Sequence, residues 1–287
     1  MVGMSTPRRA EAWRVEAFSG NARFELLQEI GRGGMGTVYE AYDREREMTV
    51  ALKVVHELDA HGLYRLKTEF RARADLEHRN IVRLGELFED DGHWFFTMEL
   101  VEGWTFVEWV RAAAIGVPAH EARAALETRL RDCVRQLASG LELLHRRGMV
   151  HRDLKPSNVL VTAKGRVVIL DFGLVGSAAP GHRSAGQDVV GTAAYMAPEQ
   201  ARTPQVGPAA DLYAVGVMMY ECLLGDLPFE GSPVEVLLRK QQEDAPVAGL
   251  RGDLADLCRE LLRRNPDGRP TATAVSSRLS GRAATEE

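Results

Sequence analysis

The chain has 287 residues, of which 45% are hydrophobic and 27% are charged, and its formal net charge is -5. This is ordinary globular composition, which argues against a disordered chain, a collagen-like fibre and a disulfide-stapled mini-protein. The 36 basic and 41 acidic residues are mixed along the chain, so the net charge does not favour binding to nucleic acid or to an anionic membrane. At this length we expect one large domain, or two lobes with a cleft between them.

Cysteine content and the N-terminus predict the compartment. Cys133, Cys222 and Cys258 are odd in number and far apart, which fits neither a disulfide framework nor a zinc site. The first residues lack the apolar run of a secretory signal, and no window reaches about 18 uncharged apolar residues. We therefore predict a cytoplasmic location with no membrane segment in this chain, and a membrane tether outside it stays open.

The first part of the chain has the pattern of a β-sheet. Residues 1–22 are polar and are expected to form a tail. Within residues 23–98, the runs FELLQEI, TVYEAY, MTVALKVV, IVRLGELFE and HWFFTMEL are strand-like, and one helix is predicted from roughly His61 to Glu77. We interpret residues 23–98 as a β-rich lobe with one helix.

After a hinge at residues 99–103, the apolar spacing becomes helical over residues 104–276, and residues 277–287 form a second polar tail. One helix ends at Gly148, as a helix cap would, and carries an apolar face made of Leu130, Cys133, Val134, Leu137, Leu141 and Leu144. A second stripe, Val234, Leu237 and Leu238, is also expected in the core. The sequence predicts an α+β, bilobal fold, and two lobes suggest a ligand site in the cleft.

A glycine cluster, GRGGMGTV, separates two of the predicted strands. Gly31, Gly33 and Gly36 would let backbone N–H groups approach an anion closely. A plain glycine hairpin is the alternative. A dinucleotide-binding turn would need a helix next, whereas TVYEAYD has a strand pattern.

A lysine and a glutamate are predicted to meet behind this loop. Strand alternation places Lys53 on the same face as Ala51 and Val55, where an ammonium needs an anionic partner. On the predicted helix, the neighbouring Leu66 and Phe70 turn Glu69 toward the core. The alternative for Lys53 is a solvated edge residue.

The strongest motif is HRDLKPSN at residues 151–158, with DFG beginning at Asp171. Its two carboxylates, Asp153 and Asp171, and the amide of Asn158 flank the short strands VLVT and VVIL. Metal-assisted phosphoryl transfer requires such a set: one carboxylate orients the attacking hydroxyl, while the other carboxylate and the amide oxygen hold hard cations.

Together these motifs resemble those of the eukaryotic-type (Hanks-type) serine/threonine protein kinases found in bacteria, from about Phe24 to Pro270. The resemblance implies a bilobal protein-kinase-like fold. It makes Asp153 the catalytic base and Lys155 the cation on the transferring phosphate. Thr192 would contact both Asp153 and Lys155. Asn158 and Asp171 would be ligands of Mg²⁺, with Mn²⁺ as an alternative.

The resemblance also implies an ATP site. Lys53 would bind the α- and β-phosphates and be held by Glu69, while the hinge backbone would bind the adenine edge and Met98 would control access behind it. The implied ATP-binding residues are Gly31, Arg32, Gly33, Gly34, Met35, Gly36, Val38, Ala51, Lys53, Met98, Glu99, Val101 and Leu160.

The resemblance also implies that residues 171–199 form the activation segment, where phosphorylation would regulate activity. Ser177, Ser184 and Thr192 are candidate phosphorylation sites, and a phosphate on Ser184 would pair with Arg152. The alternative is that Ser184 is a solvated linker serine. Structural roles are implied for three further residues: Glu199 would pair with Arg269, and Asp211 would brace the catalytic loop.

One residue departs from the family pattern. Four residues after Glu69 the family usually has an apolar side chain against the Phe of DFG, and here the residue is Arg73. Its aliphatic stem could cover Phe172. Otherwise the helix would sit outward, and the isolated domain would be slow.

The predicted function is transfer of the γ-phosphoryl group of MgATP to Ser or Thr hydroxyls of proteins, including the chain's own activation loop, in signalling. Protein substrates are the expected partners, with self-association for trans-autophosphorylation. The alternatives are a pseudokinase, a small-molecule kinase and a regulatory scaffold. Lys53, Glu69, Asp153, Asn158 and Asp171 argue against the pseudokinase, and GTAAYMAPEQ argues against the small-molecule kinase.

Overall fold

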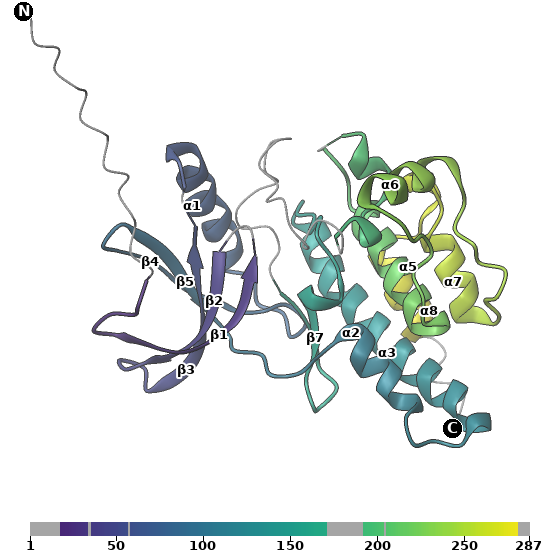
Figure 1. Ribbon diagram of the computed structural model, residues 1–287, viewed down its shortest axis with the longest axis horizontal. Helices are drawn as coiled ribbons and strands as arrows, with labels where there is room; N and C mark the ends of the chain where they lie inside the picture. The colour runs from purple at the N-terminus through teal and green to yellow at the C-terminus, as the bar shows by residue number, and fades with distance from the viewer. Residues whose placement is uncertain (1–17, 34–35, 57, 171–191, 204, 281–287) are drawn as a thin grey trace, which may run out of the picture.

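The computed structural model describes residues 18–33, 36–56, 58–170, 192–203 and 205–280. Within these residues a β-rich lobe is followed by a helical lobe, as Figure 1 shows. The predicted α+β, bilobal fold is confirmed.

The β-rich lobe is built on one antiparallel sheet with the order β1-β2-β3-β5-β4. Its strands are β1 (Phe24–Gly33), β2 (Gly36–Asp43), β3 (Met48–Val55), β4 (Leu84–Asp90) and β5 (His93–Met98). The two faces of β3 pack into separate hydrophobic cores. Ala51 and Val55 belong to the main core, whereas Val50, Leu52 and Val54 belong to a second core with Phe24. Lys53 therefore lies on the face that Ala51 and Val55 share, as predicted.

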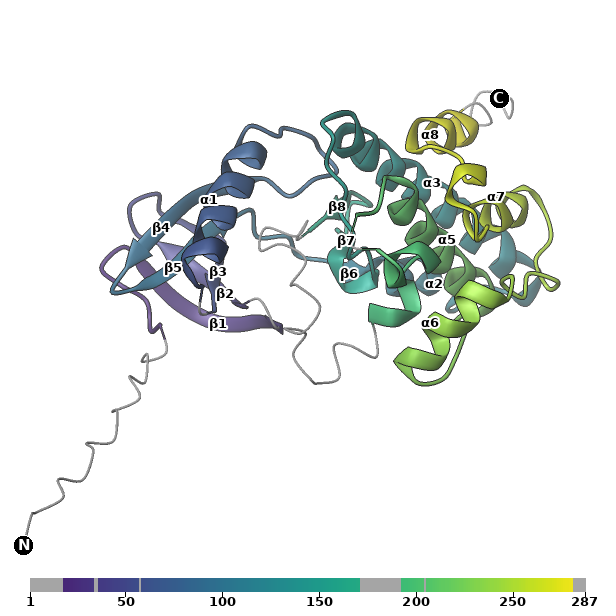
Figure 2. The same ribbon diagram turned by 90° about the horizontal axis from the view of Figure 1, so that it is seen from above.

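The predicted helix is α1 (Ala60–Ala74), which lies alongside the sheet in both ribbon views (Figures 1 and 2). It begins at Asp59, whose carboxylate accepts a hydrogen bond of 2.7 Å from the backbone N–H of Gly62. Leu66 and Phe70 are buried against the sheet. The helix ends at Ala74 rather than at Glu77.

The helical lobe contains the remaining elements. Its helices are α2 (Phe106–Arg111), α3 (Ala119–Arg146), α5 (Ala209–Leu224), α6 (Pro233–Gln242), α7 (Asp253–Leu261) and α8 (Ala272–Ser280). Its short strands are β6 (Trp104–Thr105), β7 (Val159–Val161) and β8 (Val167–Ile169), and its 3₁₀ turns are η1 (Ala112–Ala114), η2 (Pro156–Asn158), η3 (Pro198–Ala201) and η4 (Pro266–Gly268).

The apolar face predicted for α3 is confirmed, and that predicted for α6 is corrected. All six predicted side chains of α3 are at most 1% exposed, and Gly148 after its end has a φ of 72°. On α6, however, Val234 is 66% exposed and Leu238 51%. The helix instead buries Val236 and Lys240, because the surface it packs against lies on its other side.

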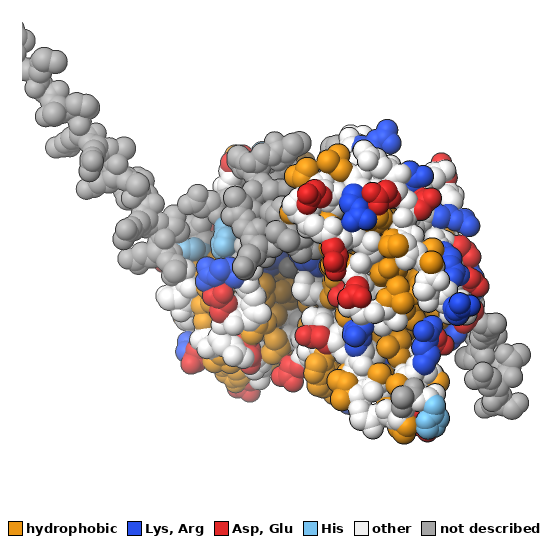
Figure 3. Space-filling view, turned by 45° about the vertical axis from the view of Figure 1, so that its right-hand side comes forward, with side chains coloured by type: hydrophobic (Ala, Val, Ile, Leu, Met, Phe, Trp, Pro, Cys, Tyr) orange, Lys and Arg blue, Asp and Glu red, His pale blue; other side chains and the backbone are white. Residues whose placement is uncertain are grey.

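The lobes meet at two places. The backbone N–H of Val82 donates to the carbonyl of Ile169, and the N–H of Ile169 donates to the carbonyl of Asn80, each at 2.9 Å. At the hinge, a side chain on Gly103 would place its Cβ 2.3 Å from the carbonyl oxygen of Val161, so only glycine fits there. Between these connections the molecular surface is hollowed, as Figure 3 shows.

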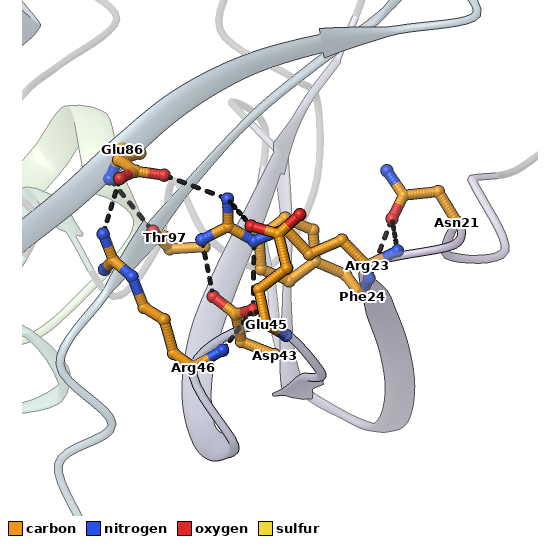
Figure 4. Close-up of polar contacts among 8 residues, drawn as sticks. All are labelled: Asn21, Arg23, Phe24, Asp43, Glu45, Arg46, Glu86 and Thr97. Atoms are coloured by element: carbon orange, nitrogen blue, oxygen red, sulfur yellow. Dashed lines mark hydrogen bonds and ion pairs between the residues drawn. The ribbon is translucent and has the colours of Figure 1, made fainter.

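A cluster of charged side chains lies where β1 begins and β2 ends (Figure 4). Arg23 donates to both carboxylate oxygens of Asp43, at 3.0 and 2.8 Å, and also pairs with Glu45 and Glu86. Asp43 is 1% exposed, and the hydrogen bond from Arg23 holds the pKa of its carboxyl below the ordinary value. The pair joins the start of β1 to the end of β2.

We expect Asp43→Asn to destabilise the fold by about 1 to 3 kcal/mol at pH 7, because the partly buried Arg23 guanidinium loses the most buried of its three charged partners. Since the folded pKa of Asp43 is depressed, its stabilisation is fully present above the unfolded pKa near 4 and is lost as the pH falls through the folded value. The difference in the free energy of unfolding between wild type and Asp43→Asn should therefore be constant from pH 7 to 5 and shrink below about pH 4. Urea unfolding from pH 7 to 3 measures this, with Glu45→Gln as the exposed control; an unchanged difference at pH 3 would contradict it.

Candidate active site

The catalytic loop at residues 151–158 is held from below by Asp211 on α5. This carboxylate is 1% exposed and accepts the backbone N–H of His151 at 2.9 Å and that of Arg152 at 2.8 Å. A third contact, of 2.8 Å, joins it to Nε2 of His145. Arg152 has a φ of 69°, which is uncommon for a residue other than glycine. The structure thus contains the brace predicted for Asp211.

Three predicted site residues, Lys155, Asn158 and Thr192, gather around Asp153. Nζ of Lys155 lies 3.4 Å from Oδ2 of Asp153 and donates to Oγ1 of Thr192 at 3.2 Å. The side-chain N–H₂ of Asn158 donates to the backbone carbonyl and to Oδ2 of Asp153, at 2.7 and 3.1 Å. Asp153 keeps 43% of its side chain exposed, so a substrate could reach it. Among the described residues, Thr192 is hydrogen-bonded to Lys155, and it lines the same small pocket as Asp153 without a hydrogen bond to it.

Lys53 has the environment that the strand pattern predicts. It is 8% exposed on β3, and in the sheet register it lies opposite Val38 on β2 and Phe96 on β5. A buried ammonium is costly unless anionic or polar groups surround it. The position suits a cation that holds an anionic ligand.

Glu69 differs from the expectation, because 29% of its side chain is exposed and its carboxylate pairs with Arg73 at 3.2 Å. No ion pair in the described part of the chain joins Glu69 to Lys53. Arg73 is 9% exposed, and burial lowers the pKa of its guanidinium. The departure seen at position 73 therefore places a competing cation on Glu69, and the Lys53–Glu69 pair stays a prediction.

The residues predicted to contact adenine come from both lobes. Val38 and Ala51 come from the sheet, Leu160 comes from β7, and Met98 at the end of β5 is 9% exposed. Ala51 lies opposite Met98 in the register. The four residues thus come from the strands of both lobes.

Two long-range contacts fix the first hinge residue, Glu99. Its backbone N–H donates to the carbonyl of Arg83 at 2.9 Å. Arg166, between β7 and β8, donates to both carboxylate oxygens of Glu99, at 2.6 and 2.9 Å. Sequence reasoning missed Arg166, since no local pattern indicates a partner 67 residues away. Val101, the other predicted hinge contact, is half-buried.

The predicted pair of Glu199 and Arg269 is present. Arg269 donates to both oxygens of Glu199, at 2.6 and 2.9 Å, and to the carbonyls of Arg263, Ala209 and Arg264. Its side chain has no exposed surface. The pair ties η3 to the turn after η4.

Several predicted residues lie outside the described residues: Gly34, Met35, Asp171, Phe172, Ser177 and Ser184. Gly31, Arg32, Gly33 and Gly36 are described, in β1 and at the start of β2. The candidate site thus contains a carboxylate, an ammonium, an amide and a hydroxyl within contact distance. Such a group can hold a hydroxyl, accept its proton and offset negative charge nearby. Across the described residues, no helix is both long enough and apolar enough to cross a bilayer.

Comparison with known proteins places this site in a family. The protein kinase domain model matches residues 24–278. Among curated proteins, the probable serine/threonine-protein kinase pknA2 of Bifidobacterium longum is 35% identical over 89% of this chain and 34% of its own length. The serine/threonine-protein kinases PknL of Mycobacterium tuberculosis and PrkC of Bacillus subtilis are 37% and 32% identical over 79% of this chain, and over 56% and 34% of their own lengths.

A solved structure agrees. The structure described as Rad53 1-466 in complex with AMP-PNP superimposes with a TM-score of 0.69 at 27% identity, over 88% of this chain and 64% of that one. The chain spans between a third and about half of the three curated relatives.

Proposed function

The chain belongs to the protein kinase domain family, in its bacterial serine/threonine branch, and from this premise we propose that it transfers the γ-phosphoryl group of ATP to Ser or Thr hydroxyls of proteins. The observation that carries the proposal is the group around Asp153, where Lys155, Asn158 and Thr192 converge. This arrangement supplies a base, a cation and a hydroxyl contact at one point.

In the proposed mechanism, Asp153 accepts a hydrogen bond from the substrate hydroxyl and takes its proton as the new phosphorus–oxygen bond forms. The bond between the γ-phosphorus and the β–γ bridging oxygen breaks, and ADP leaves with that oxygen. Lys155 balances the negative charge on the transferring phosphoryl group. Asn158 keeps the Asp153 carboxylate oriented through a hydrogen bond of 3.1 Å to its Oδ2 and fixes the loop through a second, of 2.7 Å, to the Asp153 backbone carbonyl. No covalent enzyme intermediate forms, because the hydroxyl attacks the γ-phosphorus directly.

ATP is proposed to occupy the cleft, with its adenine between Val38, Ala51 and Leu160 and its phosphates near Lys53. The fit to Mg²⁺ rests on Asn158, whose amide N–H₂ donates to Asp153 and leaves the amide oxygen, a ligand suited to a hard cation. Asn158 and Asp171 would hold the ion, and it would neutralise phosphate charge when bound; Mn²⁺ has the same ligand preference.

The proposed partners are proteins that present Ser or Thr, including a second copy of this chain for trans-autophosphorylation. Thr192, Ser177 and Ser184 are the proposed acceptors in residues 171–199. A cytoplasmic location, and the boundaries 23–98, 99–103 and 104–276 for the β-rich lobe, the hinge and the helical lobe, belong to the same proposal.

The test is incubation of the purified chain with MgATP and a generic basic protein, followed by mass spectrometry of both proteins. Phosphate on Ser or Thr in the wild-type reaction, and not with Asp153→Asn, is expected. Wild-type protein that binds ATP but transfers no phosphate to itself or to the basic protein would overturn the proposal and favour a pseudokinase.

We expect Arg73→Leu to raise the turnover of the isolated chain by about fivefold, since a partly exposed ion pair competing for Glu69 is worth about 1 kcal/mol. Without the guanidinium, the Glu69 carboxylate becomes available to Lys53. Steady-state phosphorylation of the basic protein measures the change. Arg71→Leu, the same substitution at an exposed position of α1, is the control and should leave turnover unchanged. Equal or lower turnover for Arg73→Leu would show that Arg73 does not restrain the active arrangement.

A further inference from the structure

A buried ammonium lies beneath the backbone that follows Thr192. Lys240, on α6, has 0% exposure, and its Nζ donates to the carbonyls of Ala193, at 3.0 Å, Ala194, and Met196, at 2.9 Å. Nζ also lies 5.2 Å from the centroid of the Tyr213 ring. None of the partners described for Lys240 is a carboxylate.

Such a site is unusual, because a buried lysine is normally paired with an acid. Here three carbonyl oxygens take the three N–H donors of the ammonium, so the group is fully hydrogen-bonded without a counter-charge. Desolvation by burial lowers the pKa of Lys240 to about 7. The carbonyls and the ring face of Tyr213 act in the opposite direction and favour the charged form. Without Lys240, the three carbonyls would face each other with no donor between them.

The backbone that Lys240 holds borders the site. Thr192, which accepts from Lys155, directly precedes it, and η3 begins two residues after it, at Pro198. Tyr195 and Met196 also line the small pocket that contains Asp153 and Thr192. Residues 193–196 therefore border the position that a hydroxyl bound at Asp153 would occupy.

This stretch has a second attachment, on the opposite side. The Tyr195 hydroxyl donates to Glu221 of α5 at 2.7 Å. The side chains of Ala193 and Ala194 are too small to fix a backbone by packing alone. Polar contacts to α5 and to α6 therefore hold the stretch, together with the packing of the buried Met196 side chain.

We propose that Lys240 is a positioning residue for protein substrates, holding the backbone of residues 193–196 in the shape on which a peptide lies beside Asp153. The inference rests on the proposed function and assigns α6 a part in it. Because Lys240 contacts neither the cleft residues Lys53 and Met98 nor Asn158, its loss should affect peptide binding and leave ATP binding unchanged.

The test compares wild type with Lys240→Met, which keeps the length of the side chain and removes its three donors. The substrate is a peptide taken from the stretch that wild type phosphorylates in the basic protein. We expect the KM for peptide to rise by about tenfold or more, because buried carbonyls are left unsatisfied and the stretch shifts. The KM for ATP should stay within about twofold, since the cleft residues are not touched.

Two further variants make the result specific. Lys240→Arg keeps a buried donor and should restore part of the peptide affinity. Arg239→Met removes a cation from the exposed face of the same helix, where it pairs with Glu243, and should change neither KM. If Lys240→Met does not fold, as thermal unfolding would show, Lys240→Gln is measured by the same criterion.

The outcomes distinguish failure of the positioning role of Lys240 from failure of the proposed function. A folded Lys240→Met or Lys240→Gln protein whose peptide KM equals that of wild type overturns the positioning role. An equal rise in the KM for peptide and for ATP also overturns it, because that indicates general loosening of the fold. Wild-type protein that phosphorylates no peptide overturns the proposed function instead, and the role of Lys240 with it.

Discussion

Asp153→Asn is expected to lower the turnover of phosphoryl transfer by about 10² to 10⁴, the range typical of a general base. The amide cannot accept the proton of the substrate hydroxyl, although it has nearly the same shape as the carboxylate. The contacts of Lys155 with Thr192, and of Asn158 with the backbone carbonyl of Asp153, do not need the carboxylate, so the local structure should persist.

Steady-state kinetics with the basic protein measures this loss, and binding of ATP is measured in parallel. We expect turnover to fall while ATP affinity stays close to wild type, because the carboxylate acts on the acceptor hydroxyl. Asp226→Asn, the same change at an exposed carboxylate after α5, is the matched control. Turnover within about twofold of wild type for Asp153→Asn would remove Asp153 from the role of base.

Glu199→Gln is expected to destabilise the fold by about 3 to 5 kcal/mol, because it leaves the fully buried Arg269 guanidinium without an opposite charge. The remaining partners of Arg269 are the carbonyls of Arg263, Ala209 and Arg264 and the ring of Tyr213, whose centroid lies 4.9 Å away. They satisfy donors but do not neutralise the charge.

Urea unfolding of Glu199→Gln, of Arg269→Met and of the double variant measures the coupling between the two residues. The double variant should be more stable than the sum of the single losses predicts, since it removes both charges from the interior. Glu260→Gln, which breaks the exposed pair with Arg278, serves as control and should cost less than about 1 kcal/mol. A loss below about 1 kcal/mol for Glu199→Gln would contradict the prediction.

Much of the candidate site could be predicted because its residues lie in short motifs. HRDLKPSN places Asp153, Lys155 and Asn158 within six consecutive positions, and the structure brings these three side chains into contact. The strand alternation that put Lys53 on an inner face is equally local. Where the spacing of residues along the chain sets their distance in space, the sequence pattern was sufficient to predict their position.

The contacts that could not be predicted join residues far apart in the sequence. Arg166 reaches Glu99 from the turn between two short strands, and Lys240 reaches the backbone after Thr192 from a helix more than 40 positions later. The stripe of Val234 and Leu238 had the right spacing for a buried face, yet α6 packs through Val236 and Lys240. Periodicity shows that a helix has an apolar side, but it does not show which side its neighbours cover.

The sequence by itself determined the family, the α+β bilobal architecture and the identity of the groups around Asp153, since these follow from local motifs and from the period of the apolar residues. Only the tertiary structure decided the partners of two charged side chains, Glu69 and Lys240. It turned Glu69 toward Arg73, and it gave the buried Lys240 three carbonyls rather than a carboxylate. The partner of a buried charge is set by the packing of distant elements, because each element must satisfy its polar groups with whatever its neighbours bring within hydrogen-bond distance.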